Sequence, residues 1–311
     1  MKRVSILIII LFSFILNSCG KSIRHERYSD TARINNDLTI ITKSEKSRNY
    51  KNIETLNSAA QYIFNELKKS CDTVYFQPYL VNGIEYKNVI GSIGLKNKEK
   101  IVIGVHYDVA GEQEGADDNA SGVVGVLELA RLLSKEVLKY RIDFVAFTLE
   151  EPPFFRTNEM GSYIHAKSLF EKKEKIKGMI CLEMIGYFND LPNSQDYPLG
   201  FLKLFYGGKG DYITVVQKFG GGSFARQVNR LMKKQKVIKT KSFKGPARLS
   251  GVDFSDHRNY WKFGYSAVMI TNTAFYRNKN YHEKTDKMET LDIKRMGLVI
   301  DEIYLTIKQI K

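Results

Sequence analysis

Short apolar runs alternate with amphipathic segments through most of the chain after residue 100. The runs predict strands at residues 101–106, 142–149, 178–185 and 266–271, and the spacing between them predicts helices at residues 122–134, 159–170, 223–234 and 291–310. Strands that alternate with helices favour parallel pairing, with helices covering both faces of the sheet. The pattern therefore predicts an α/β fold with a mixed, largely parallel central sheet.

The segments before residue 100 add a helix and a hairpin to this prediction. Apolar residues at helical spacing predict a helix over residues 52–69. Residues 74–95 indicate two strands joined at Asn82-Gly83, a pair typical of tight hairpin turns. We therefore expect the sheet to begin with an antiparallel pair.

Two further apolar segments, residues 201–206 and 212–216, indicate additional strands. No linker divides residues 48–311, and the length of 311 residues suits one large domain. We therefore expect a single folded domain over residues 48–311.

The first residues have the composition of an export signal. Lys2 and Arg3 precede an almost wholly apolar stretch, residues 4–16, which is shorter than an ordinary membrane span. The letters "LNSC" that end at Cys19 resemble a bacterial lipobox. We expect residues 1–18 to be a lipoprotein signal peptide and Cys19 to carry a lipid, with an ordinary signal or an uncleaved anchor as the alternatives.

Residues 19–47 are polar and charged with little periodicity, which predicts a tether between the lipid and the folded domain. The protein is then expected to be an exported bacterial lipoprotein, anchored to a membrane of the cell envelope. Cys71 and Cys181 are the remaining cysteines, and we expect them to be buried free thiols, with a disulfide between them in an oxidising compartment as the alternative.

The chain is basic, with 48 Lys and Arg against 34 Asp and Glu and a net charge of +14. Its basic residues are scattered, and no nucleic-acid-binding motif accompanies them. We therefore expect no nucleic-acid partner, and interpret the charge as a solvated surface.

Polar side chains follow the predicted strands at one end, where ligand sites of open α/β sheets form. The residues at these positions are a mixture of histidines and carboxylates: His106, Asp108, Asp118, Glu150, Glu151, Glu183 and His282. Each has an ordinary structural explanation, such as a helix cap at Asp118. The two histidines and three of the carboxylates, Asp118, Glu151 and Glu183, could be nitrogen and oxygen ligands for zinc or a similar divalent ion, with Glu150 left as a base.

This order of motifs resembles the co-catalytic two-zinc aminopeptidases, a family that also includes glutamate carboxypeptidase and the glutaminyl cyclases. The matching segments between about residues 100 and 292 read "HYD", "GADDNASGVVGVLELAR", "LEEPPF", "LEMIGY", "SDHRNYWKFGYSAVMITNTAFYRN" and "YHEKTDKMETLD". The resemblance implies a zinc-exopeptidase (phosphorylase/hydrolase-like) fold.

The resemblance also implies a role for each candidate residue. One metal site would use His106 and Glu183, the other Glu151 and His282, and Asp118 would bridge them. Glu150 would be the general base, Tyr281 would donate to the developing oxyanion, and Asp108 would orient His106. In the resembling enzymes a cis peptide follows the bridging aspartate, so the Asp118–Asn119 bond is expected to be cis. Many relatives have Asp where this chain has Glu183.

The implied reaction is hydrolysis of an N-terminal peptide bond by a water activated between two zinc ions. Asp256 is a candidate to hold the free amine of the substrate, with a helix cap as the alternative interpretation. Phe154, Phe155, Phe254 and Tyr276 are candidate walls of a substrate pocket, with packing in the core as the alternative. Two other functions stay open: a single-metal glutaminyl cyclase, and a non-catalytic envelope lipoprotein.

Overall fold

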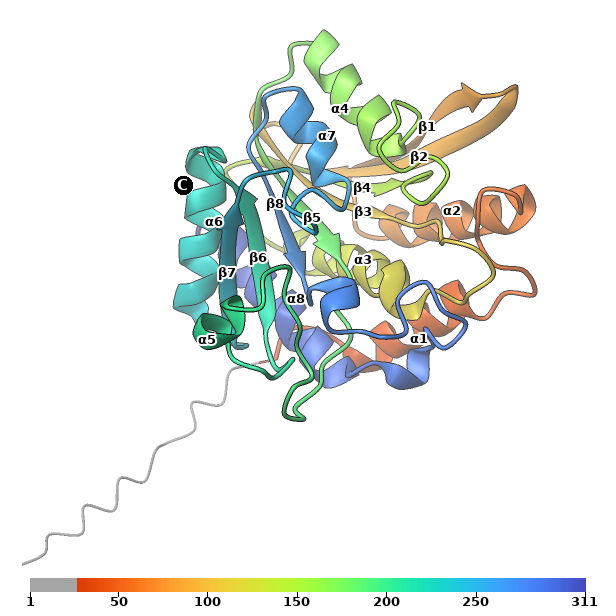
Figure 1. Ribbon diagram of the computed structural model, residues 1–311. Helices are drawn as coiled ribbons and strands as arrows, with labels where there is room; N and C mark the ends of the chain where they lie inside the picture. The colour runs from red at the N-terminus through yellow and green to blue at the C-terminus, as the bar shows by residue number, and fades with distance from the viewer. Residues whose placement is uncertain (1–26) are drawn as a thin grey trace, which may run out of the picture.

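The computed structural model describes residues 27–311 (Figure 1). The predicted signal peptide and Cys19 lie outside the described residues. Within the described part, no helix combines the length and the apolar character needed to cross a bilayer. Cys71 and Cys181 are both free thiols, as expected, but only Cys181 is buried, whereas Cys71 is partly exposed.

One eight-stranded sheet forms the centre of the molecule, in the order β1-β2-β4-β3-β5-β8-β6-β7. Its strands are β1 (Thr73–Val81), β2 (Ile84–Ile93), β3 (Lys100–His106), β4 (Arg141–Phe147), β5 (Ile176–Glu183), β6 (Ile213–Lys218), β7 (Thr240–Gly245) and β8 (Ala267–Thr271). The four neighbours β4, β3, β5 and β8 run parallel. Strand β2 pairs antiparallel with β4, and strand β6 pairs antiparallel with β8. The prediction of a mixed, largely parallel sheet is confirmed.

The hairpin at Asn82-Gly83 forms as expected. Val81 pairs with Ile84 across the turn, and both turn residues have positive φ angles, 51° and 80°. Two central residues with φ > 0 make the type of turn that matches the twist of antiparallel strands.

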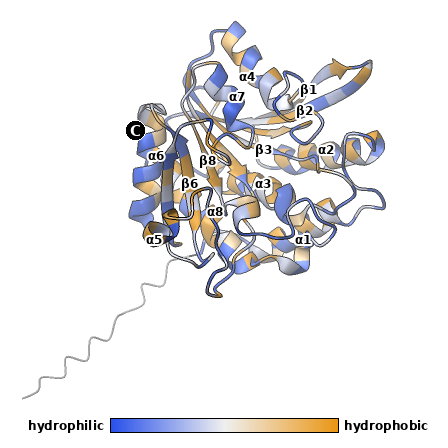
Figure 2. Cartoon of the chain, in the orientation of Figure 1, coloured by the Kyte–Doolittle hydropathy of each residue, from blue (hydrophilic) through white to orange (hydrophobic). Residues whose placement is uncertain are grey.

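Helices cover both faces of the sheet, which is strongly apolar at its centre (Figures 1 and 2). The helices are α1 (Thr31–Thr42), α2 (Ile53–Lys68), α3 (Gly122–Leu133), α4 (Gly161–Glu171), α5 (Leu202–Tyr206), α6 (Gly222–Gln235), α7 (His257–Lys262) and α8 (Ile293–Lys308). Side chains alternate between two cores: Ile101 and Ile103 of β3 face α2, α3 and α8, while Val102 faces the core that contains α4 and α7. His106 and Glu183 continue the second of these two faces.

The segment predicted to be a tether contains a packed helix. In α1, Ile34, Leu38 and Ile41 are buried, and the Asp30 side chain accepts hydrogen bonds from the backbone amides of Ala32 and Arg33 at its N-terminus. The spacing of four and three residues places these apolar side chains on one face. The prediction of a tether over residues 19–47 is therefore wrong for the helix, and the folded body begins before residue 48.

Two other local predictions differ from the structure. Residues 201–206, expected to be a strand, form the short helix α5, because a brief apolar run does not distinguish the two states. Strand β7 was not predicted, since Lys241 and Lys244 give it the polar composition typical of an edge strand.

Candidate metal centre

The carboxyl ends of four parallel strands bring the candidate ligands to one edge of the sheet. His106 ends β3, Glu183 ends β5, and Glu150 and Glu151 follow β4. Asp118 comes from the turn before α3, and His282 from the loop after β8. Segments separated by up to 176 residues in sequence (from His106 to His282) therefore meet because the strands share one direction.

Asp118 lies between the two histidines. One of its carboxylate oxygens is 3.3 Å from His106 Nε2, and the other is 3.3 Å from His282 Nε2. His106 Nε2 is also 3.4 Å from Glu183 Oε2, and His282 Nε2 is 3.1 Å from Glu151 Oε2. The five predicted ligands thus form two His–carboxylate pairs that share Asp118.

The donor atoms of this cluster are close enough to surround a cation. Ligand atoms of His106, Asp118 and Glu151 all lie within 4.8 Å of one another. Among the described residues, Asp118 Oδ2, Glu151 Oε1 and His282 Nε2 are buried atoms without a hydrogen-bond partner. Because buried polar atoms are normally satisfied, these three indicate a site built for a further group.

Asp108 supports the centre in two ways. Its backbone carbonyl lies 3.2 Å from His106 Nδ1, which favours the tautomer that leaves Nε2 free as a ligand. Its carboxylate is 3.6 Å from the same nitrogen, and accepts hydrogen bonds from the backbone amides of Glu150 and Glu151 at 3.2 and 3.1 Å. The side chain therefore positions the Glu150-Glu151 pair, and the backbone orients the imidazole.

The turn that carries Asp118 is held by two aspartates that the sequence did not single out. Asp286 accepts hydrogen bonds from the backbone amides of Asp117 and Asp118, at 2.9 and 3.0 Å. The buried Asp117 carboxylate accepts from Asn272 and Asn278 and from two backbone amides after β5. The Asp118–Asn119 peptide bond is cis, as expected. The doubled Asp in "GADDNASG" was the available signal for Asp117.

Arg48 fixes the loop that leads into this turn. Its side chain is fully buried and donates to the backbone carbonyls of Tyr107, Glu114 and Gly115. Burial lowers the pKa of Arg48 to about 10. This value is still well above neutral pH, so the guanidinium stays charged. No local pattern in the sequence marked this contact, because Arg48 lies 59 residues or more from its partners.

Tyr281 stacks on the ligand candidate beside it. The rings of Tyr281 and His282 are 3.8 Å apart between centroids and inclined by 18°. Burial raises the pKa of the Tyr281 hydroxyl, and the negative charges of Asp118, Glu151, Glu150 and Glu183 raise it further. The hydroxyl therefore stays protonated, which is the state needed to donate a hydrogen bond.

The electrostatics of the cluster reflect many charges in a buried space. Burial raises the pKa of Glu150 well above its usual value, and raises that of Glu151 to about 7. Burial opposes the charge of His282, but Asp118 and Glu151 raise its pKa to about 10. The pKa of Asp118 is lowered, because the two histidines outweigh the effect of burial.

Asp256 is fully buried, and neither of its carboxylate oxygens has a hydrogen-bond partner among the described residues. It stands immediately before α7 but makes no side-chain cap, so the helix-cap interpretation is wrong. Burial raises its pKa to about 7. Asp256 is not among the residues that line the pocket beside the metal centre, which is described below. Its role in holding a substrate amine stays a prediction.

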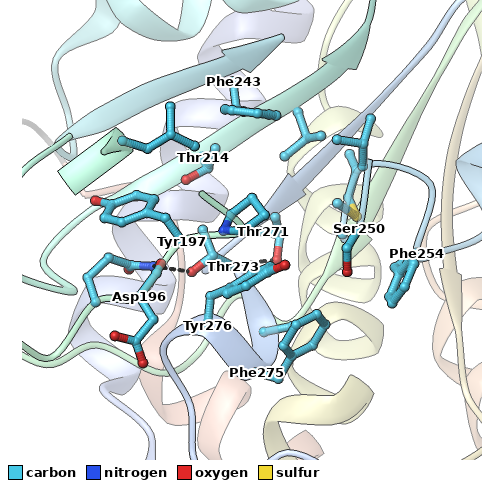
Figure 3. Close-up of a pocket in the computed structure, with 18 of the residues that line it drawn as sticks. Asp196, Tyr197, Thr214, Phe243, Ser250, Phe254, Thr271, Thr273, Phe275 and Tyr276 are labelled. Carbon is cyan, nitrogen blue, oxygen red and sulfur yellow. Dashed lines mark hydrogen bonds between the residues drawn. The ribbon is translucent and has the colours of Figure 1, made fainter. Parts of the chain in front are cut away.

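A pocket whose lining includes Glu183 adjoins the centre, and Figure 3 shows other residues of its lining. Of the four residues predicted as walls, Phe254 and Tyr276 line it. Phe155 packs behind Phe254 with 5.7 Å between ring centroids, and Phe154 packs against Tyr50 and Tyr86. The segment around α5 and strands β6, β7 and β8 supply other walls that the sequence did not reveal.

Comparison with known sequences places these features in a family. Residues 88–306 match peptidase family M28. The chain is 39% identical over 321 residues to the uncharacterized protein YfbL of Escherichia coli, with 97% of this chain and 98% of that protein covered. It is 26% identical over 230 residues to leucine aminopeptidase 1 of Pyrenophora tritici-repentis, covering 67% of this chain and about half, 51%, of the fungal protein.

Solved structures share the fold. The Legionella pneumophila LapA aminopeptidase superposes with a TM-score of 0.70 at 20% identity, covering 90% of this chain and 71% of that chain. A glutaminyl cyclase from Bacteroides thetaiotaomicron superposes with a TM-score of 0.67 at 18% identity, covering 92% and 99%. At these identities the likeness concerns the fold alone.

Proposed function

Because the chain belongs to peptidase family M28, we propose that it is a metal-dependent exopeptidase that releases amino-terminal residues from peptides. One observation carries this proposal: the two oxygens of Asp118 each face a different histidine at 3.3 Å. A carboxylate in that position can join two metal sites, one with Glu183 and the other with Glu151.

The donor set fits zinc. Each half of the cluster offers one imidazole nitrogen and one carboxylate besides the shared Asp118, which leaves an open position in a four-coordinate site. The three buried atoms without partners belong to this set. When bound, two zinc ions would supply Lewis-acid chemistry and a water of lowered pKa.

The side chains around the donor set have complementary tasks. Glu150 is buried, and its backbone amide donates to Asp108. Burial raises the pKa of its carboxyl group, but cations bound beside it would favour the ionised form, which would accept a proton from water and pass it to the leaving amine. The protonated Tyr281 hydroxyl would donate to the oxyanion that develops during hydrolysis.

Digestion of a peptide library by the full-length protein tests this proposal. With zinc added, we expect mass spectrometry to show residues leaving one at a time from the amino end, and a chelator to stop the reaction. A glutaminyl cyclase would instead release ammonia from peptides that begin with Gln and leave their peptide bonds intact. Intact peptides in the presence of zinc would overturn the exopeptidase proposal.

We also propose that Cys19 carries a lipid that anchors the protein to a membrane of the cell envelope. The lipobox-like sequence before Cys19 supports this. Cys19→Ser should abolish lipid labelling and leave an unprocessed precursor, whereas Cys71→Ser, the control, should leave labelling unchanged. Persistent labelling and membrane attachment of Cys19→Ser would return the segment to a plain signal or anchor.

A further inference from the structure

A row of side chains leads from the metal centre into the pocket. Glu183 of β5 pairs with Thr271 of β8, and Thr271 pairs with Thr214 of β6. Directly paired residues project from the same face of a sheet, and neighbouring strands are about 4.8 Å apart. Thr214 therefore stands two strand spacings, about 10 Å, from the metal-ligand candidate Glu183. All three side chains line the pocket.

The hydroxyl group of Thr214 has no hydrogen-bond partner among the described residues. Thr214 is only 4% exposed, and its Oγ1 is buried. The hydroxyl groups of the other two threonines that line the pocket have partners: Thr271 accepts from the Thr273 backbone amide at 3.0 Å, and Thr273 accepts from Gln195 at 2.8 Å. Figure 3 shows Thr214 near Tyr197 and Thr271, on the side of the pocket formed by the sheet.

Much of the remaining lining is aromatic: Tyr197, Tyr206, Tyr212, Phe243, Phe254, Phe275 and Tyr276. The buried guanidinium of Arg277 lies against Tyr212, 4.6 Å from the centroid of its ring. The hydroxyl groups of Tyr197 and Tyr206 are already bonded, to Tyr212 with 2.9 Å between oxygens and to the Ser242 carbonyl at 2.9 Å. Asp196 is exposed and paired with Lys279 at 2.8 Å. An aromatic ring could pack between these side chains. A neutral polar group at the far end of that ring could form a hydrogen bond with the buried Thr214 hydroxyl.

On the basis of the proposed exopeptidase function, we propose that Thr214 selects substrates whose amino-terminal residue is tyrosine over those that begin with phenylalanine. With the scissile bond at the metal centre, the side chain of the first residue extends along the row from Glu183 towards Thr214. Its ring packs between the aromatic walls, and its hydroxyl exchanges a hydrogen bond with Thr214 Oγ1. Phenylalanine fills the same space but leaves the buried threonine hydroxyl unpaired, which is unfavourable.

Dipeptide kinetics test the inference. For the zinc-loaded, full-length protein, we expect kcat/KM for Tyr-Ala to exceed that for Phe-Ala by about tenfold, the effect of one buried neutral hydrogen bond. In Thr214→Val, which has nearly the same shape, this ratio should fall to about one. Thr214→Ser is the matched control, because it keeps the hydroxyl and should keep the preference for tyrosine.

The outcomes separate this inference from the function on which it rests. If the wild-type protein cleaves neither dipeptide and also leaves the peptide library intact, the exopeptidase proposal fails; if it cleaves the library but neither dipeptide, only the role of Thr214 is overturned. If both are cleaved with equal kcat/KM, or if the tyrosine preference persists in Thr214→Val, only the role of Thr214 is overturned. Equal wild-type values would overturn the role of Thr214 without any variant, so the inference can be tested even if Thr214→Val does not fold.

Discussion

Replacing Glu150 by glutamine is expected to lower kcat by about two to four orders of magnitude, the usual contribution of a general base. Glutamine keeps the shape of the side chain but cannot accept the proton. Metal content should stay unchanged. Among residues 27–311, His106 and His282 pair with Asp118, Glu151 and Glu183, and neither histidine pairs with Glu150. Steady-state kinetics together with metal analysis of the purified variant measure both effects.

The neighbouring glutamate provides a matched control for this experiment. Glu151→Gln makes the same chemical change one residue away, but at a carboxylate 3.1 Å from His282 Nε2. It should therefore lower metal content as well as activity. If Glu150→Gln loses metal and Glu151→Gln retains it, the two roles are reversed.

Asp118→Asn is expected to have an effect on metal binding that exceeds any other single substitution in the centre. An amide has one oxygen and one NH2 group, so it can no longer present an oxygen to each of His106 and His282. Loss of an outer hydrogen-bonding partner typically costs about 10–100-fold in metal affinity or activity, and loss of a shared ligand should cost more. Zinc titration by calorimetry should show fewer than two sites.

Asp117→Asn separates ligand loss from damage to the turn. Asp117 makes hydrogen bonds to Asn272, Asn278 and two backbone amides rather than to the histidines. Its substitution should therefore lower the Tm of the metal-free protein, whereas Asp118→Asn should act mainly on metal binding. Two zinc sites of unchanged affinity in Asp118→Asn would contradict the bridging role.

The sequence could group the candidate residues because their positions follow a rule of the fold. In a parallel sheet, residues that directly follow different strands meet at one edge, so His106, Glu151 and Glu183 could be grouped without any knowledge of distance. The supporting contacts of Arg48 and Asp286 could not be grouped in this way. They come from loops, whose positions depend on packing between segments far apart in the chain.

The errors in the fold have local causes. The helix α1 carries the readable pattern of Ile34, Leu38 and Ile41, but its other side chains are so polar that the segment resembles a linker. The apolar run at α5 suggests a buried strand, whereas Leu204 and Phe205 are in fact 85% and 78% exposed. In both cases tertiary packing, rather than local composition, decides whether a side chain meets water.

The contacts of α1 also determine when the fold can be completed. The Ser29 amide donates to Asp301 of α8 at 2.7 Å, a contact between residues 272 positions apart, and the Ser29 hydroxyl donates to the Gly297 carbonyl. The start of the folded body is thus bound to its last helix. During synthesis the contacts of Ser29 cannot form until α8 has been made, whereas Asp30 already has a partner in Glu128 of α3. A nascent chain stalled before α8 should therefore be cleaved more readily at Ser29 than the complete chain.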